Sequence, residues 1–297
     1  MYYTGIADEA GALIDTQIRA TRELGWDQIE ARMVEVPGYP KANIHDLPEP
    51  AFEAAAEKLE AAGVRVCCFG SAIGNWAKKI DEPFDSSLEE ARRAIPRMQR
   101  LGTRLIRIMS FAIREGEDQM AAERFRRVRE LTEMFLGAGI QPVHENCMNY
   151  GGMGWPYMLE LLENVPGLKV VFDTGNPVFN LDRSKPKPWP RQDAWEFFEH
   201  VRDHIVHVHI KDAKWDPARN EAVYTYPGEG EGCVKAILRD LLKSGYDGGL
   251  SIEPHLAVVF HDDSVQSSAE AQYGSYVEYG RRLMRLVEEA RGEVGRA

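Results

Sequence analysis

The sequence has few cysteines, and their spacing matches neither a disulfide framework nor a zinc site built from thiolates. The four are Cys67, Cys68, Cys147 and Cys233, with no CxxC pair, and the adjacent two cannot readily bridge to each other. Disulfide-rich secreted domains and structural zinc sites need denser, regularly spaced cysteines. We therefore expect reduced, mostly buried thiols and a cytoplasmic protein.

Long apolar runs and an excess of positive charge are missing as well. No uninterrupted apolar stretch approaches the length of a membrane span, and the opening MYYTGIADEAG has neither the basic segment nor the apolar core of a signal peptide. The 36 Lys and Arg residues are outnumbered by 47 Asp and Glu residues, which gives a formal net charge of −11. Because an acidic protein repels a phosphate backbone, we expect no membrane and no nucleic-acid partner.

A dividing linker and a glycine-rich phosphate turn are also missing. No Ser/Gly stretch or change in composition separates the 297 residues into parts, and the early segment IADEAGA is not a dinucleotide-binding turn. Short apolar or β-branched segments instead alternate with amphipathic segments along the whole chain. This alternation is typical of β-α units around a parallel sheet.

Eight such units can be placed. The expected strands are 3–8, 27–32, 64–70, 103–110, 140–146, 168–175, 205–212 and 249–255. The expected helices are 11–25, 48–62, 86–101, 118–138, 155–164, 191–203, 233–244 and 270–292, several of which end in a glycine that stops the helix. Eight units in a chain of this length predict an α/β fold, a (β/α)₈ TIM barrel, with a single domain over residues 1–297. Its active site is expected at the C-terminal ends of the strands.

Strand parity predicts which polar residues enter the barrel, because side chains alternate between the two faces of a strand. In IVHVHIKD (205–212) the apolar residues share one parity and face the helices, which turns His209 inward. The same rule turns Asp173, Glu253 and Glu145 inward, while His144 points toward the helices. Four successive strands thus each deliver one polar group to the same end of the barrel.

Three carboxylates and one imidazole in a cavity predict a bound cation. Buried like charges are costly and are relieved by protonation, by cationic partners or by a metal. A set of ligands rich in oxygen with one imidazole suits Mn²⁺, Mg²⁺ or Co²⁺ better than an ion that prefers thiolates, and Zn²⁺ stays open. We expect one divalent ion, with Mn²⁺ first, held by Glu145, Asp173, His209 and Glu253.

Four further residues are candidates for contacting a substrate. Lys211 and His255 have the inward parity, and Arg107 lies on the fourth expected strand. Trp76 follows the third strand, where an aromatic ring can cover the apolar face of a sugar. For each of the four, ordinary packing or a salt bridge is the alternative role.

Two loops bear on the site and on assembly. The segment YPGEGEGCV (226–234) is interpreted as a flexible turn between the seventh strand and its helix. The proline-rich segment NLDRSKPKPWPRQD (180–193) is an extended connection that suits a lid or a docking segment, and we expect it to be the contact if the chain forms a homo-oligomer.

The ordered motifs HEN, FDTGN, HVHIKD, PGEGEG and GYDGGLSIEPH resemble the sugar phosphate isomerase/epimerase superfamily. These xylose isomerase-like TIM barrels include ketose 3-epimerases, inosose dehydratases and, more distantly, endonuclease IV. The resemblance implies that Glu145, Asp173, His209 and Glu253 bind one divalent metal and that the two Glu also exchange the substrate proton. Where those epimerases have a His that contacts the substrate, this chain has Asn176, which is a fifth candidate for contacting the substrate. That departure argues against specificity for a free ketohexose and against an endonuclease-like metal cluster.

The function expected from these residues is that of a metal-dependent isomerase or epimerase of a sugar or polyol. Glu145 and Glu253 would move a proton next to the carbonyl through an enediolate. A lyase or dehydratase that expels a leaving group from the same enediolate is the rival within enzymes, with His255 or His144 as acid or base. A non-catalytic ligand-binding subunit is the rival of another class.

Overall fold

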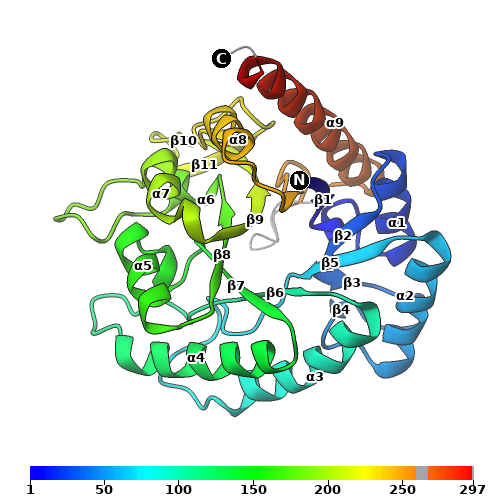
Figure 1. Ribbon diagram of the computed structural model, residues 1–297, viewed down its shortest axis with the longest axis horizontal. Helices are drawn as coiled ribbons and strands as arrows, with labels where there is room; N and C mark the ends of the chain where they lie inside the picture. The colour runs from blue at the N-terminus through cyan, green and yellow to red at the C-terminus, as the bar shows by residue number, and fades with distance from the viewer. Residues whose placement is uncertain (259–266, 296–297) are drawn as a thin grey trace.

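Eight parallel strands form the central sheet of the computed structural model, which describes residues 1–258 and 267–295. They are β1 (Tyr2–Gly5), β2 (Gln28–Ala31), β5 (Arg65–Phe69), β6 (Leu105–Ile108), β7 (Gln141–Glu145), β8 (Lys169–Asp173), β9 (Ile205–Ile210) and β12 (Gly249–Ile252). Their order in the sheet is β1, β12, β9, β8, β7, β6, β5, β2. A parallel bridge from Ile6 to Glu30 joins the two edges, so that the sheet curls into a nearly closed barrel (Figure 1).

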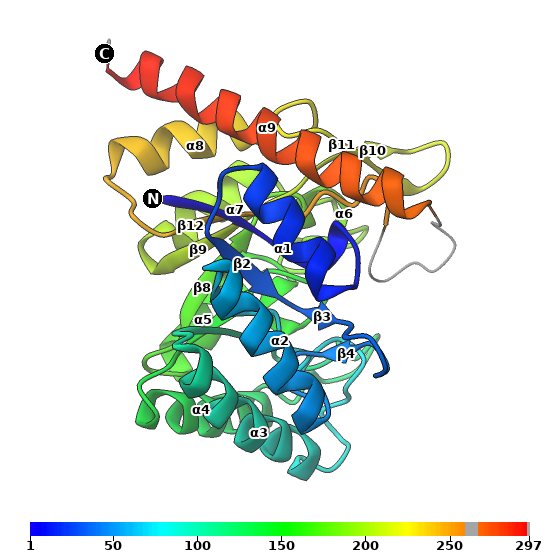
Figure 2. The ribbon, with the colours of Figure 1, turned by 90° about the vertical axis from the view of Figure 1, so that its right-hand side faces the viewer.

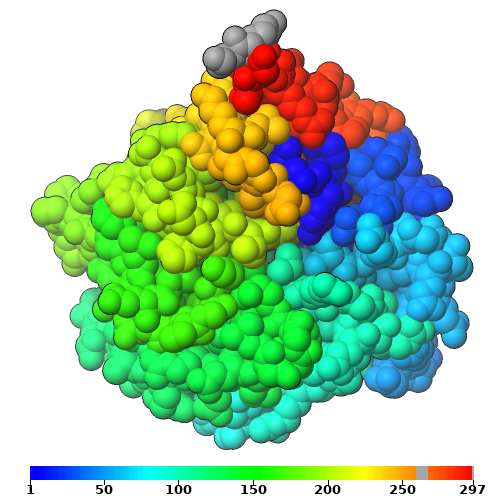
Figure 3. Space-filling view, in the orientation of Figure 1, coloured from blue at the N-terminus to red at the C-terminus, as the bar shows by residue number. Residues whose placement is uncertain are grey.

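Helices surround this barrel. They are α1 (Ile14–Glu23), α2 (Glu49–Ala62), α3 (Asp85–Leu101), α4 (Ala121–Gly137), α5 (Trp155–Asn164), α6 (Asn176–Phe179), α7 (Ala194–Val201), α8 (Val234–Lys243) and α9 (Ala269–Val294), with 3₁₀ turns η1 (Ala7–Glu9), η2 (Tyr150–Gly152) and η3 (Arg202–His204). The segments follow one another around the molecule in chain order, and α9 lies next to the N-terminal residues (Figure 3). The predicted single-domain TIM barrel is therefore confirmed.

Glycines end several helices, as the sequence predicts. Gly63 ends α2 with a φ of 62°, and Gly102 ends α3 with a φ of 67°. The left-handed conformation costs a glycine little because it has no Cβ, and it lets the backbone N–H turn back onto carbonyls of the last helical turn. Each helix can therefore reverse at once into the next strand.

The outer face of the strands carries the apolar residues that parity assigns to it. Phe172 of β8 packs on Phe197 and Phe198 of α7, with ring centroids 5.8 and 5.6 Å apart. Val208 and Ile252 are also fully buried. This layer between strands and helices holds much of the hydrophobic core, which leaves the interior of the barrel for polar side chains.

The expected strands all end one to three residues earlier than predicted, and two of them show why. The segment 103–110 forms a strand only from Leu105 to Ile108, because the N–H of Met109 donates to the carbonyl of Ile73 (3.0 Å) in the loop after β5. At 249–255 the strand ends at Ile252, and the chain bends at His255, whose φ is 52°. Sequence periodicity does not show these bends because the polar residues keep the alternation of the strand.

Two short hairpins extend one end of the barrel. They are β3 (Met33–Val34) with β4 (Ala42–Asn43), and β10 (Asp212–Asp216) with β11 (Glu221–Thr225). Both lie at the end opposite the N-terminus (Figure 2). The segment 226–234 is not a free turn, because the carboxylate of Asp212 accepts the backbone N–H groups of Gly228, Gly230 and Gly232 at 2.8 to 2.9 Å. Each helix in residues 1–258 and 267–295 is either too short or too polar to span a bilayer.

Candidate metal centre and active site

The structure brings together the four residues that strand parity turns inward. Glu145 is the last residue of β7, Asp173 is the last residue of β8, His209 lies in β9 and Glu253 directly follows β12. These strands are neighbours in the sheet. One nitrogen or oxygen atom from each residue lies within 4.8 Å of the other three, and all four residues are buried. They form one cluster, the acidic cluster, at the C-terminal ends of the strands.

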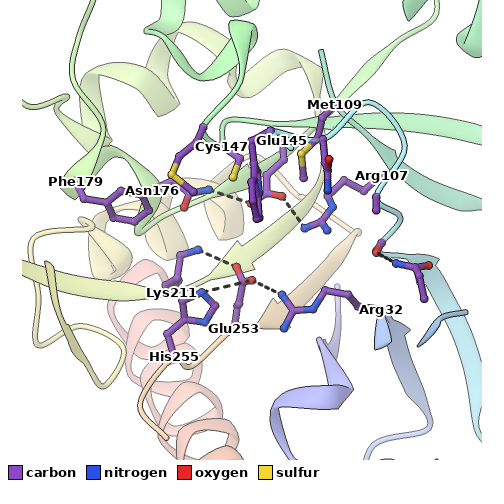
Figure 4. Close-up of a pocket in the computed structure, with 16 residues that line it drawn as sticks. Arg32, Arg107, Met109, Glu145, Cys147, Asn176, Phe179, Lys211, Glu253 and His255 are labelled. Carbon is purple, nitrogen blue, oxygen red and sulfur yellow. Dashed lines mark hydrogen bonds and ion pairs between the residues drawn. The ribbon is translucent and has the colours of Figure 1, made fainter. Parts of the chain in front are cut away.

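Three cations neutralise the carboxylates of the acidic cluster (Figure 4). Arg107 Nη1 donates to Glu145 Oε2 at 2.8 Å, and Arg32 Nη1 donates to Glu253 Oε1 at 2.9 Å. Lys211 Nζ donates to the other oxygen of Glu253, also at 2.9 Å. Burial would raise the pKa of both Glu side chains, but Arg107 lowers the pKa of Glu145 to about 2, and Lys211 holds the pKa of Glu253 well below its usual value. Both are therefore ionised at neutral pH.

The negative charge of Asp173 is less well neutralised by its neighbours than that of Glu145 or Glu253. Its Oδ1 accepts the backbone N–H groups of Gly175 and Asn176 at 2.8 and 2.7 Å. Its Oδ2 has an ion contact with Lys211 at 3.0 Å but no hydrogen bond from the part of the chain that the structure describes. Burial raises the pKa of this carboxyl to about 7 in spite of Lys211. Asp173 is therefore the carboxyl of the cluster that an added cation would stabilise most.

One nitrogen of His209 also has no hydrogen-bond partner among the described residues. This atom, Nδ1, lies 3.7 Å from Glu145 Oε1, 3.9 Å from Asp173 Oδ2 and 3.9 Å from Glu253 Oε2. A buried imidazole nitrogen that faces three carboxylate oxygens is a donor set that divalent cations accept. The residues of the acidic cluster therefore fit one divalent ion.

Glu30 of β2 holds the opposite edge of the His209 ring. Its carboxylate lies 3.0 Å from His209 Nε2 and 2.9 Å from His207 Nε2, and it accepts the hydroxyl of Ser251 at 2.8 Å. All four side chains are fully buried. A carboxylate beside Nε2 keeps the proton on that nitrogen and leaves the lone pair of Nδ1 for a metal. Glu30 therefore fixes the tautomer of His209 that ligation requires.

A cavity of about 40 Å³ lies against the acidic cluster and is lined by Glu145 and Glu253. All five residues expected to contact substrate line it: Trp76, Arg107, Asn176, Lys211 and His255. Asn176 also donates from Nδ2 to Glu145 Oε1 at 2.9 Å. At this position Asn176 supports a carboxylate of the cluster in addition to facing the cavity.

His255 is oriented by a carboxylate from the other side of the barrel. Its Nδ1 lies 2.7 Å from Oε1 of Glu9 in η1, and its backbone N–H donates to the other oxygen of Glu9 at 2.8 Å. The ring of Tyr224, in β11, packs edge-on with its centroid 5.0 Å away. His255 Nε2 lies 3.9 Å from Glu253 Oε1. The imidazole is thus fixed beside the acidic cluster.

Sequence reasoning does not assign a role in the site to Glu9, Glu30, Arg32 or Tyr224. Glu30 and Arg32 share the inward parity of the expected strand 27–32, so a signal is present, but parity does not identify their partners. Glu9 follows the first strand and Tyr224 lies in a hairpin that periodicity does not predict. No local pattern marks these two residues.

His144 lies on the other face of β7, as parity predicts. Its Nε2 lies 2.9 Å from the hydroxyl of Ser110, and its ring packs against Gly151. Burial lowers the pKa of His144 to about 3, so the ring is neutral at physiological pH. The side chain belongs to the layer between strands and helices.

A TIM barrel with buried carboxylates and an imidazole at the C-terminal ends of its strands defines the class of this protein. Within that class, the model of the xylose isomerase-like TIM barrel family matches residues 18–275. The chain belongs to this family. A search of the curated proteins gives no match.

Solved structures share the fold along nearly the whole chain. A D-tagatose 3-epimerase-like protein is 18% identical with a TM-score of 0.70, covering 99% of this chain and 100% of the other. A xylose isomerase-like TIM barrel protein from Mycobacterium smegmatis in complex with magnesium is 19% identical with a TM-score of 0.68, and the match covers 98% of this chain and 97% of the other. The probable 3-DHS dehydratase involved in petrobactin synthesis from Bacillus anthracis is 16% identical with a TM-score of 0.68, and the match covers 96% of this chain and 99% of the other. At these identities the likeness concerns the fold.

Proposed function

We propose that this protein is a metal-dependent isomerase or epimerase of a sugar or polyol. The observation that carries the proposal is the acidic cluster, in which two ionised carboxylates, Glu145 and Glu253, line one cavity beside an imidazole nitrogen of His209 that has no hydrogen-bond partner among the described residues. Proton transfer next to a carbonyl needs such a pair of carboxylates and a cation to stabilise the enediolate. The 3-epimerase-like neighbour supports the same reaction type.

The two carboxylates take the proton-transfer roles. Glu145 is held by Arg107 and Asn176, and Glu253 is held by Arg32 and Lys211, so each presents its oxygens in a fixed position. One Glu removes the proton next to the carbonyl, and the other returns a proton to the opposite face, which inverts that carbon. The ammonium of Lys211 adds positive charge where the enediolate oxygens become negative.

Glu145, Asp173, His209 and Glu253 would hold the divalent ion. When bound, this ion polarises the carbonyl and lowers the free energy of the enediolate. Three carboxylates and one imidazole favour Mn²⁺, Mg²⁺ or Co²⁺. We expect Mn²⁺ to support the highest activity, and the magnesium complex of the Mycobacterium smegmatis relative supports an ion of this group.

The pair of Glu9 and His255 favours a second candidate, a lyase. An imidazole fixed by a carboxylate at 2.7 Å and lining the cavity is placed to protonate a leaving group from the same enediolate. The dehydratase neighbour supports this reaction type. Mass analysis of the products separates the two candidates, because dehydration removes water from the substrate and epimerisation leaves its mass unchanged.

Deuterium exchange tests the proposed function. The protein loaded with Mn²⁺ is incubated with a panel of keto-sugars and keto-polyols in D₂O, beside the variants Glu145→Gln and Glu163→Gln, of which the second changes an exposed residue of α5. We expect deuterium next to the carbonyl with the wild type and Glu163→Gln, and at least a hundredfold slower uptake with Glu145→Gln. Equal rates for Glu145→Gln and wild type would contradict the proposal. A metal content near zero in protein purified without chelator would favour a non-catalytic binding subunit.

A further inference from the structure

A second, larger cavity continues from the cavity at the acidic cluster. Its volume is about 420 Å³, against about 40 Å³ for the inner one. Three side chains line both cavities: Trp76, Met148 and Phe179. The two cavities therefore adjoin at these three side chains, and one molecule can extend from the inner cavity into the outer.

The inner cavity is too small for a whole sugar. Its volume is about 40 Å³, roughly a tenth of the about 420 Å³ of the outer cavity. Ligand sites in proteins usually measure about 300 to 1,000 Å³. Most of any substrate must therefore lie in the outer cavity.

The outer cavity has apolar side chains that the inner one lacks. Five of the sixteen residues that line the inner cavity are charged, whereas Ile113, Met153 and Leu181 add apolar surface to the outer one, together with the shared Trp76 and Phe179. A bare polyol can place only its C–H faces against this lining, and its hydroxyls would lose hydrogen bonds to water there.

The two guanidinium groups of the outer cavity already have partners. Arg183 forms an ion pair with Glu115 and stacks over Trp189, with its guanidinium carbon 4.7 Å from the ring centroid. Arg191 stacks on Trp215 at 3.4 Å and donates to the carbonyl of Phe179. Glu115 neutralises Arg183, and the contacts of Arg191 occupy one planar face and one N–H group. Apolar side chains therefore supply much of the surface that the outer cavity offers to a ligand.

We infer that the substrate is a keto-sugar or keto-polyol that carries an uncharged aromatic or similarly bulky apolar substituent, which lies in the outer cavity between Trp76, Phe179 and Leu181. The reacting end occupies the inner cavity. This inference names the substrate class and rests on the proposed function for the reaction at that end. Substrates of this class would be bound by stacking and apolar burial as well as by hydrogen bonds.

A matched pair of sugars tests the inference. D-fructose and its 6-O-benzyl ether share the same carbonyl end and differ in one aromatic group at the far end. Dissociation constants are measured by calorimetry with Mn²⁺-loaded wild type, with Leu181→Gln and with Leu136→Gln, a matched change at an exposed position on α4. We expect the benzyl ether to bind wild type and Leu136→Gln at least tenfold more tightly than fructose. Leu181→Gln is expected to reduce that preference at least threefold.

Three results would separate the proposed substrate class from a bare sugar or polyol. A benzyl ether that binds no more tightly than fructose, or that shows no measurable binding, would overturn the inference, and so would a preference that Leu181→Gln leaves intact. Deuterium uptake from D₂O is followed in the same samples. A preference for the benzyl ether without deuterium uptake would contradict the proposed reaction but support binding across the inner and outer cavities. Deuterium uptake without that preference would support the reaction and contradict the proposed substrate class.

Discussion

His144 and Glu145 are neighbours in β7, and both are buried, yet they belong to two different regions of the molecule. His144 faces the helices, where it contacts Ser110 and is neutral. Glu145 faces the barrel interior, where it is ionised between Arg107 and Asn176. Degree of burial therefore does not separate a packing residue from a candidate catalytic one, whereas the face of the strand from which the side chain projects does.

The same contrast extends around the barrel. The layer between strands and helices is mainly apolar, with Phe172, Val208 and Ile252 fully buried. The interior at the C-terminal ends of the strands is charged, and its carboxylates are stable only because cations and hydrogen bonds compensate each of them. Removing one partner from a buried charged network leaves an uncompensated charge, which is costly. Substitutions in the interior should therefore have larger effects on function than equally buried substitutions in the outer layer.

The largest effect is expected from Glu253→Gln. The amide keeps the shape of the side chain but can neither accept the substrate proton nor offer a carboxylate to the cation. We expect deuterium uptake from D₂O to fall by a factor of about 10² to 10⁴. Circular dichroism of the variant should match that of the wild type, and Glu163→Gln serves as the matched surface control. Uptake within threefold of wild type would show that Glu253 does not carry the proton.

Removal of the metal should have the next largest effect. A ligand present at a hundred times its dissociation constant adds about 2.7 kcal/mol to the free energy of unfolding. We expect chelation with EDTA to lower the thermal midpoint by several degrees and added Mn²⁺ to restore it. Asp173→Asn should abolish the response to Mn²⁺, because it removes one of the proposed ligands. A midpoint that ignores both EDTA and Mn²⁺ would contradict a metal at the acidic cluster.

A smaller effect is expected from Glu30→Gln, which alters a partner of His209 without touching the cavity. The carbonyl oxygen of Gln accepts a weaker hydrogen bond than a carboxylate, and its amide can turn to donate to Nε2, which would place the imidazole proton on Nδ1. We expect the affinity for Mn²⁺ to fall about 10- to 100-fold. Calorimetry measures the affinity, and ¹⁵N NMR of the histidine rings reports the tautomer. Unchanged affinity with an unchanged tautomer would leave Glu30 a purely structural role.

The sequence predicts the fold well because the relevant signals are local. Eight alternations of strand and helix need only periodicity, and Gly63 and Gly102 mark helix ends by a conformation that glycine adopts easily. Parity also predicts that Glu145, Asp173, His209 and Glu253 meet at one end, since parallel strands in a barrel place equivalent residues at the same depth.

The remaining features of the site depend on contacts between distant segments. Glu30 reaches His209 across 179 positions of the chain, and Arg32 reaches Glu253 across 221. Parity says that such side chains point inward, but only the closure of the barrel decides which of them meet. Tyr224 arrives on a hairpin outside the barrel sheet, and no residue of its strand β11 is fully buried, so no core face imposes an apolar alternation there.

The smallest effect is expected in the outer layer, from His144→Phe. The aromatic ring keeps most of the packing against Gly151 and loses the hydrogen bond to Ser110, so at pH 7 the free energy of unfolding should fall by about 1 kcal/mol, with deuterium uptake within twofold of wild type.

Acid should reverse the order of stability of the wild type and the His144→Phe variant. The buried ring of His144 has a pKa of about 3, whereas the same group in the unfolded chain titrates near its ordinary value of 6.5. Between these values only the unfolded chain takes up the proton, so the wild type loses about 1.4 kcal/mol of stability from this residue for each unit by which the pH falls below 6.5. His144→Phe lacks this loss. Urea unfolding at pH 7 and pH 5 should therefore find the variant less stable at the higher pH and more stable at the lower one, while a constant difference would show that His144 is protonated in the folded protein.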